Sequence, residues 1–277
     1  MQRLEHPSFR FNQWPDTKWG ARDKPILIVD GTLHRIKSLS QTVSGQAAYV
    51  VGVGDRELPK LAAFLEVKFL HFYELRAVDL SSLSAIPHLR NLKIHWSTKL
   101  IALDAIGQLR GLESLVLVDV PKVRDLSPLE ALSELAALEY SGGIWNPNHA
   151  VSLAPIASLP KLEELALTNL RVESGGLRPL GQCRSLKTLA LSNQFDTEDY
   201  AYLSVALPQV QCQSFAPWVR VNHSDGKDTM ITGRRKPFLN SKEDAAKIAA
   251  YEEAFRRLQR QFASNPALQR TPAGGRR

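Results

Sequence analysis

The sequence predicts an α/β solenoid with a parallel sheet on its concave side, because one apolar pattern recurs along the middle of the chain. In six segments, apolar residues occupy the first, fourth and sixth positions. Most of these segments are followed by a second apolar series with a spacing of three residues. The six segments begin at Val67, Leu89, Leu112, Leu135, Leu162 and Leu186. Their starts are 22, 23, 23, 27 and 24 residues apart, which is a period typical of repeat architectures.

Each repeat is predicted to be a short strand followed by a return segment. Side chains alternate along a strand, so the apolar residues at positions 4 and 6 share one face. The second series, such as Leu126, Leu129 and Leu132, lines one side of a helical or 3₁₀ segment that packs against that face. Neither half buries its apolar side alone, so stacked units are needed to build a core. Residues 48–215 are predicted to form this solenoid, with six clear units and a degenerate unit at each end.

The flanking segments do not repeat and predict a cap at each end of the solenoid. Residues 1–47 are expected to form an amino-terminal cap, with a strand over 25–29 and a turn at Asp30 and Gly31. Residues 216–240 are expected to be a loop-rich connection, and 264–277 a disordered tail rich in Pro and Gly. Between them, 241–263 is predicted to be an amphipathic helix.

Two features predict the helix over 241–263. Ser241 is a suitable N-cap residue, with Asp244 in the first turn. Apolar residues then recur at spacings of three or four along one side of the helix: Ile248, Tyr251, Phe255, Leu258 and Phe262. This apolar stripe either docks on the end of the solenoid, which we favour, or binds another chain or a membrane surface.

The segment VRDLSPLEALSELAALEY (123–140) resembles the short, 22-residue class of leucine-rich repeats. That class occurs in bacterial internalins and in a regulatory subunit of a protein phosphatase. The resemblance covers about 48–215 and is specific, since six phased copies rarely arise by chance. It implies a leucine-rich repeat horseshoe, a bacterial source and a non-enzymatic function in which the concave face binds a protein. It does not identify the partner.

Position 9 of the repeat departs from the family pattern. The family usually has Asn or Cys there, and its side chain bonds the backbone of neighbouring turns. This chain instead has Leu75, Ser97, Val120, Gly143, Leu170 and Gln194. Asn169 and Asn193 fall one position early. Either the register shifts by one residue after the strand, or the asparagine ladder is missing.

Composition favours a soluble protein inside the cell. The chain has 277 residues, 44% of them hydrophobic and 23% charged, and we find no apolar run long enough for a membrane span. Its first residues do not match a signal peptide, so a cytoplasmic location is expected. Cys183 and Cys212 are expected to be reduced, because two distant thiols form neither a disulfide framework nor a zinc motif. The protein is expected to be a monomer without a cofactor.

The candidate partner-binding residues lie at the strand positions that point away from the core. On that face, aromatic side chains cluster at one end, and rings supply much of the energy of protein interfaces. We expect the partner-binding site to comprise Phe69, His71, Tyr73, Lys93, His95, Trp96, Asp119 and Glu139. Two alternatives stay open, because the amino-terminal cap could fold over the aromatic residues or they could be ordinary surface. Trp145, in the expanded unit, either carries function or closes a gap between units.

The sequence shows no defensible catalytic or metal site. PILIVDGTL resembles the first motif of haloacid-dehalogenase-type phosphatases, but the nucleophilic carboxylate is replaced by Ile28. A strand that runs into a turn is the favoured interpretation of this segment. His71, His95 and Glu74 are a poor metal site, because a third convincing ligand is lacking.

Nucleic-acid binding is the alternative function. The net charge of +7 comes largely from the end of the chain, where basic residues could contact phosphate: Arg234, Arg235, Lys236, Arg256, Arg257, Arg260, Arg276 and Arg277. Acidic residues share the predicted helix, namely Glu243, Asp244, Glu252 and Glu253. This mixture of charges favours a solvated helix face, so nucleic acid is the less favoured partner.

Overall fold

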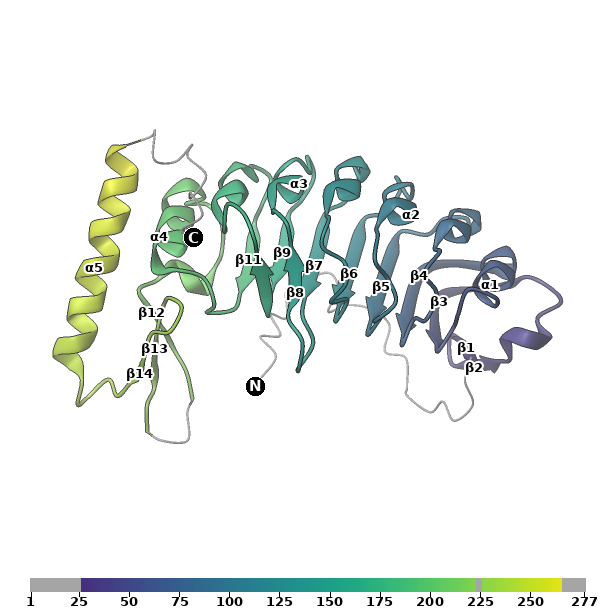
Figure 1. Cartoon of the computed structure of the whole chain (residues 1–277), viewed down its shortest axis with the longest axis horizontal. Coiled ribbons are helices and arrows are strands. Elements are labelled where there is room, and N and C mark those ends of the chain that lie inside the picture. The colour runs from purple at the N-terminus through teal and green to yellow at the C-terminus, as the bar shows by residue number, and fades with distance from the viewer. Residues whose placement is uncertain (1–25, 223–225, 266–277) are drawn as a thin grey trace.

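The computed structural model describes residues 26–222 and 226–265, and within them the repeats stack as one row of parallel strands (Figure 1). The parallel strands are β3 (Val43–Val51), β4 (Leu65–Tyr73), β5 (Asn91–His95), β6 (Ser114–Val118), β7 (Ala137–Ser141), β9 (Glu164–Leu167) and β11 (Thr188–Leu191). Equivalent repeat positions pair across the sheet, since Leu92 of β5 lies opposite both Leu70 and Leu115. The predicted phase of the six clear units is therefore correct, but the parallel sheet begins at Val43, five residues before the predicted start of the solenoid.

A short helical segment follows most strands and returns the chain to the start of the next unit. These segments are α1 (Leu58–Phe64), η3 (Ser81–Ala85), α2 (Asp104–Gly107), η4 (Ser127–Ala131), α3 (Ala154–Ala157) and η5 (Arg178–Gln182). They line the side of the row opposite the exposed sheet face in Figure 1. Leucines from both halves, such as Leu115 and Leu129, are fully buried in one continuous core between the two layers. The predicted α/β solenoid is confirmed.

Position 9 points inward, so the register predicted from the sequence is right. Leu75 and Leu170 are buried at this position. Their backbone carbonyls accept hydrogen bonds from side chains of the following unit, and these bonds form the ladder. The Ser97 hydroxyl donates to the Leu75 carbonyl at 2.8 Å, and the Gln194 side-chain amide donates to the Leu170 carbonyl at 2.7 Å. Serine and glutamine thus supply bonds that asparagine supplies in a regular repeat.

The 27-residue unit supplies its own substitute for the ladder. Its extra residues form β8 (Asn148–Ala150), which pairs in parallel with β10 (Leu170–Val172) as a second, two-stranded sheet. The fully buried Asn148 side chain accepts a hydrogen bond from the Val120 amide at 3.0 Å and donates one to the Ser141 carbonyl at 2.8 Å. An amide in the insertion therefore satisfies one backbone group of the preceding unit and one of its own unit.

An antiparallel hairpin closes the amino-terminal end of the sheet. β1 (Ile26–Val29) and β2 (Thr32–His34) are joined at Asp30 and Gly31, both with positive φ, as two-residue hairpin turns require. β1 also pairs antiparallel with β3, and η2 (Ile36–Ser38) follows the hairpin. The predicted strand and turn are present. Residues 1–25 of the predicted cap lie outside the described residues, as do 266–277 of the predicted tail.

The carboxyl-terminal end is covered by α4 (Thr197–Ala206), a small sheet and a long helix. After α4 and the short η6 (Gln213–Phe215), the segment predicted to be loop-rich forms three antiparallel strands. They are β12 (Trp218–Arg220), β13 (Thr229–Ile231) and β14 (Phe238–Leu239). The helix α5 (Ala245–Ser264) then runs beside α4 in Figure 1.

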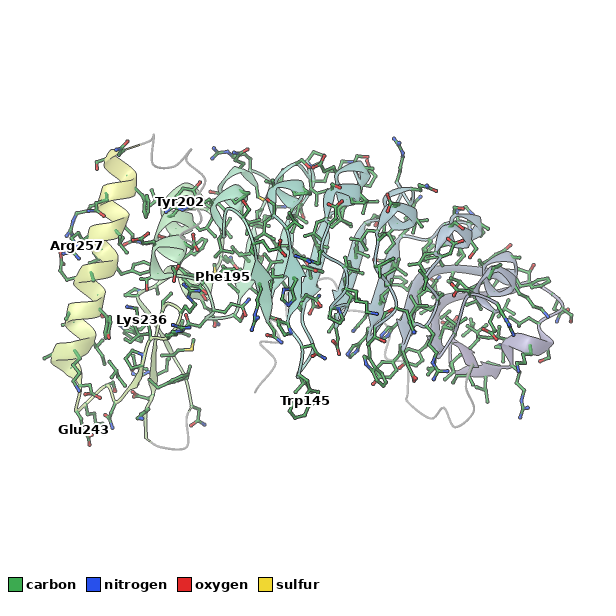
Figure 2. All side chains as sticks on the ribbon, viewed as in Figure 1. Trp145, Phe195, Tyr202, Lys236, Glu243 and Arg257 are labelled. Atoms are coloured by element: carbon green, nitrogen blue, oxygen red, sulfur yellow. The ribbon has the colours of Figure 1, made fainter. Side chains whose placement is uncertain are left out.

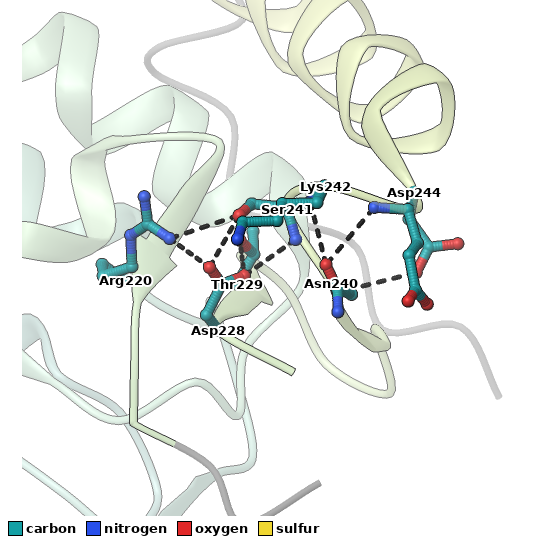
Figure 3. Close-up of polar contacts among 8 residues, drawn as sticks. Arg220, Asp228, Thr229, Asn240, Ser241, Lys242 and Asp244 are labelled. Atoms are coloured by element: carbon teal, nitrogen blue, oxygen red, sulfur yellow. Dashed lines mark hydrogen bonds and ion pairs between the residues drawn. The ribbon is translucent and has the colours of Figure 1, made fainter. Parts of the chain in front are cut away.

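The predicted start of the carboxyl-terminal helix is wrong by four residues. The Ser241 amide and hydroxyl both donate to the Asp228 carboxylate, so Ser241 does not cap the helix (Figure 3). Asn240 accepts from the backbone amides of Lys242 and Glu243, which folds these residues into a turn. The helix begins after this turn, at Ala245. A contact with a residue thirteen positions away decides the boundary, and local spacing does not reveal it.

Docking of α5 on the solenoid end is confirmed. Phe255 and Phe262 are buried in the solenoid core, and Leu258 packs against it. Ile248 is buried in a smaller cluster with Ile231 of β13. No helix in the part of the chain that the structure describes has the length and apolar content needed to cross a membrane.

Candidate functional site

Five ring side chains form a connected row across three neighbouring strands, on the sheet face opposite the core. We call this set, Tyr49, His71, Tyr73, His95 and Trp96, the aromatic row. The Tyr49 and His71 ring centroids are 4.7 Å apart, and those of His71 and His95 are 6.5 Å apart with parallel planes. Tyr73 contacts His95 at 5.1 Å and Trp96 at 5.7 Å, both edge to face. Such pairs stabilise each other and fix the positions of the rings.

Strand alternation and register build the aromatic row. On β4, Leu70 and Phe72 point into the core while His71 and Tyr73 point to the opposite face. The parallel register places Tyr49 of β3 opposite His71, and Tyr73 opposite His95. Tyr49 was missing from the sequence prediction because its unit is degenerate. It lies four residues after Gly45, which pairs with Val67, so the strand pairing places it opposite His71.

Trp96 lies at the end of the row in an unusual backbone conformation. Its φ is +61°, and Glu74, Asp119 and Asn169 at the same repeat position also have positive φ. The chain therefore turns sharply after each of these strands. A bulky residue rarely adopts this region, since its Cβ crowds the backbone. The Trp96 side chain is nevertheless 40% exposed, and it is the most exposed ring of the row.

The remaining predicted residues lie around the aromatic row at different distances. Phe69 is on β4, two residues before His71, and is partly buried. Lys93 pairs with Val116, which in turn pairs with Glu139, so the two charged side chains lie on one row of the sheet two strands apart. That separation is about 10 Å at the usual spacing of strands. Lys93 thus places a positive charge beside the rings, and Glu139 places a negative charge two strands further along the same face.

Asp119 follows β6 and lies against the backbone of the next unit. A Cβ atom at Gly143 would lie 2.4 Å from the Asp119 carboxyl carbon, so this close approach requires glycine. Burial raises the pKa of the Asp119 carboxyl. The structure places Asp119 beside the insertion of the 27-residue unit, apart from the ring contacts of the aromatic row.

Beyond β5, the same sheet face carries smaller side chains. Val116, Val118, Ala137 and Ala166 form a small buried cluster there, separate from the main core. Ser114 and Ser141 on the same strands are also buried. Large, partly exposed side chains are therefore concentrated at β4 and β5, as the sequence pattern suggested.

The segment that resembles a phosphatase motif has a structural role. The Asp30 carboxylate accepts hydrogen bonds from the backbone amides of Gln46 and Ala47, at 2.9 and 3.1 Å. It thereby ties the hairpin turn to β3. Ile28, at the position of the missing nucleophile, is buried beside Tyr49. Burial also raises the pKa of the Cys183 and Cys212 thiols to about 12, so neither is a reactive nucleophile at neutral pH.

The His71 and His95 rings are in contact, yet no third ligand joins them. Among the described residues, no group of three or more His, Cys, Asp or Glu side chains is arranged to hold a metal ion. Ring stacking accounts for the positions of both histidines.

Three basic residues of α5 pair with acidic residues of the helix or its N-cap, whereas Arg257 forms no ion pair within the described residues. Arg256 lies 3.4 Å from Glu252, Arg260 pairs with Glu253, and Lys247 lies 2.7 Å from Asp244. At least one partner of each pair is exposed to solvent, so the pairs form a helix face of mixed charge. Arg276 and Arg277 lie outside the described residues.

The repeat geometry settles the architecture. Six phased units, each a strand and a short return segment around buried leucines, form one parallel sheet. The fold is a leucine-rich repeat solenoid. No protein-family model matches the chain, and no curated protein matches it.

Solved leucine-rich repeat structures resemble this one at low sequence identity. Internalin C2 of Listeria monocytogenes is 23% identical with a TM-score of 0.45, and the match covers 59% of this chain and 69% of that one. An internalin (inlF) of the same species is 21% identical with a TM-score of 0.45, covering 66% of this chain and 50% of its own. The plant peptide hormone receptor RGFR1, solved with RGF2, is 16% identical with a TM-score of 0.36, covering 62% and 34%.

Proposed function

We propose that this protein is a non-enzymatic scaffold that binds a protein partner, with the aromatic row at the centre of its binding face. Trp96 carries the proposal. It is 40% exposed and contacts the Tyr73 ring at the end of the aromatic row. Tryptophan is among the residue types that most often dominate the binding energy of an interface.

The neighbouring side chains suit a protein surface. Tyr and Trp bury a large area with few rotatable bonds, so they often dominate the energy of an interface. Lys93 beside the rings and Glu139 two strands away place one charge of each sign on this face, where charges orient a partner more than they add affinity. A cytoplasmic location is part of this proposal, and cell fractionation tests it.

Affinity capture from the source cell's lysate, with and without nuclease, tests the proposed function. The wild-type chain is compared with a Tyr73→Ala, Trp96→Ala double variant. Ile101→Ala is the control, because Ile101 is 57% exposed and lies outside the aromatic row. Truncation of either ring side chain at an interface centre typically costs about 2 kcal/mol or more. We therefore expect a nuclease-resistant protein that the double variant loses and the control retains.

Two results would contradict this proposal. The first is capture of the same protein by the double variant at wild-type yield. The second is capture of nucleic acid that disappears with nuclease and weakens steeply with salt, which would favour the basic carboxyl-terminal region.

A further inference from the structure

A cleft lined by both charged and apolar residues lies at the carboxyl-terminal end of the solenoid, away from the aromatic row. Its volume is about 730 Å³. Pro147, from the loop of the 27-residue unit, lines one side, and Arg234 and Arg235, from the turn between β13 and β14, line another. Residues that follow β9 and β11 line the rest, including Arg171. Figure 2 shows Trp145 of the same loop projecting from the row of units.

Two asparagines hold the walls of this cleft in place. The Asn169 side-chain amide donates to the Gly143 carbonyl at 2.6 Å, which fixes the loop. The Asn193 side chain accepts from the Gly233 amide at 2.6 Å and donates to the Ile231 carbonyl at 2.8 Å, which fixes the turn. The cleft therefore exists before any ligand binds, and preorganisation of this kind lowers the cost of binding.

The turn that carries Arg234 and Arg235 is held at further points. The Arg234 amide donates to the Phe195 carbonyl at 2.6 Å, and the Thr197 hydroxyl donates to the Thr232 carbonyl at 3.0 Å. Arg235 has a φ of +59°, a left-handed conformation that an arginine rarely adopts. Several contacts thus hold Arg235 at the cleft in a costly backbone conformation.

The charges that line the cleft do not cancel. The Asp196 carboxylate lies 3.1 Å from the Arg234 guanidinium, and Asp199 pairs at 3.6 Å with Arg178 behind the cleft. In the described ranges, 26–222 and 226–265, no ion pair involves Arg171 or Arg235. Two guanidinium groups are therefore available to a ligand, and the ligand chemistry they favour is anionic.

We propose that this cleft binds an acidic peptide segment that carries a bulky apolar residue. Guanidinium groups bind carboxylates with paired hydrogen bonds, so Arg171 and Arg235 suit acidic side chains. Ile144 and Trp145 of the loop that supplies Pro147 do not line the cleft, but they are 81% and 88% exposed and offer an apolar contact to a peptide that extends beyond it. The site is separate from the aromatic row and does not depend on it.

The test uses the full chain and a fluorescein-labelled peptide of alternating glutamate and leucine, with binding followed by fluorescence anisotropy. An Arg171→Gln, Arg235→Gln double variant is expected to weaken binding at least tenfold. An Arg56→Gln, Arg110→Gln double variant loses the same charge at exposed sites away from the cleft, and is expected to change binding less than twofold. Trp145→Ala is expected to weaken binding about threefold.

Three results would overturn the proposal. The first is an equal loss of binding in both double variants. The second is that a peptide with lysine in place of glutamate binds as tightly as the original peptide. The third is displacement of the peptide by inorganic phosphate at constant ionic strength. The last result would assign the cleft to phosphate. A Tyr73→Ala, Trp96→Ala variant is expected to bind the peptide like the wild type, so failure of this proposal and failure of the proposed function are distinguishable.

Discussion

Asn169 and Asn193 occupy the same position in adjacent repeat units, and each binds a segment outside the repeat with its side-chain amide. Asn169 holds the loop inserted after β7, and Asn193 holds the turn between β13 and β14. The Asn169 bond also continues the ladder, since Gly143 is at position 9 of the preceding unit, whereas the Asn193 bonds leave the repeat. The two asparagines that do not fit the family pattern thus tie irregular segments to the regular scaffold.

Removal of the Asn193 amide is expected to loosen the carboxyl-terminal cap. Asn193→Ala leaves the Gly233 amide and the Ile231 carbonyl without their partner, which should lower the free energy of unfolding by about 2 kcal/mol. Asn193→Asp keeps the acceptor and should cost less. Urea unfolding measures both. Gln108→Ala, at an exposed position, should stay within about 0.5 kcal/mol of wild type, and an Asn193→Ala value in that range would contradict the account.

A second prediction concerns Asp199, which lies under the cap beside the half-buried Arg178. The Arg178 guanidinium lies between the Tyr202 and Phe262 rings, 4.5 and 4.6 Å from their centroids, and so connects α5 to the solenoid. Burial raises the pKa of Asp199 from 3.8 to about 6, although Arg178 opposes this shift. Asp196 and Glu198 nearby raise the Asp199 pKa further.

The sign of the expected pH dependence follows from proton binding. Between about pH 4 and 6 the folded state holds a proton on Asp199 that the unfolded state has lost, so stability falls as pH rises through this range. The difference between 3.8 and about 6 corresponds to about 3 kcal/mol. Asp199→Asn should remove this fall, as measured by urea unfolding at a series of pH values. A pH profile parallel to that of wild type would show the assignment to be wrong.

Trp96 is expected to lower stability through its backbone conformation. Trp96→Gly and Trp96→Ala both remove the ring, but only glycine relieves the left-handed φ of +61°. The glycine variant should therefore be more stable than the alanine variant by about 1 kcal/mol, although glycine usually destabilises a chain. Thermal unfolding of the two variants makes this comparison. Equal stability, or a more stable alanine variant, would show that the conformation at residue 96 carries no cost.

The sequence predicts the parts of this fold that depend on a repeated local pattern. The spacing of Leu89, Leu112 and Leu135 identifies the strands and their register, because one pattern of burial recurs in each unit. The same alternation brings His71, Tyr73, His95 and Trp96 to one face. The stripe of Ile248, Phe255 and Phe262 likewise identifies the face of α5 that docks.

Features that depend on single distant contacts were not predictable in this way. The helix start depends on Ser241 reaching Asp228, and the cleft wall depends on Asn193 reaching Gly233, forty residues later. Tyr49 joins the aromatic row only through strand pairing with His71 in a unit whose leucines are replaced. No spacing rule along the chain encodes these contacts.

Site-specific photo-crosslinking tests the central claim most directly, that the aromatic row is the binding face. A photoreactive amino acid replaces Lys93, beside the rings, or Ser84, on the return segment η3 of the opposite side. The account predicts that a partner protein in the source cell's lysate crosslinks through residue 93 and not through residue 84, and that Trp96→Ala abolishes the product. Crosslinking through residue 84 alone, or a product unaffected by Trp96→Ala, would contradict it.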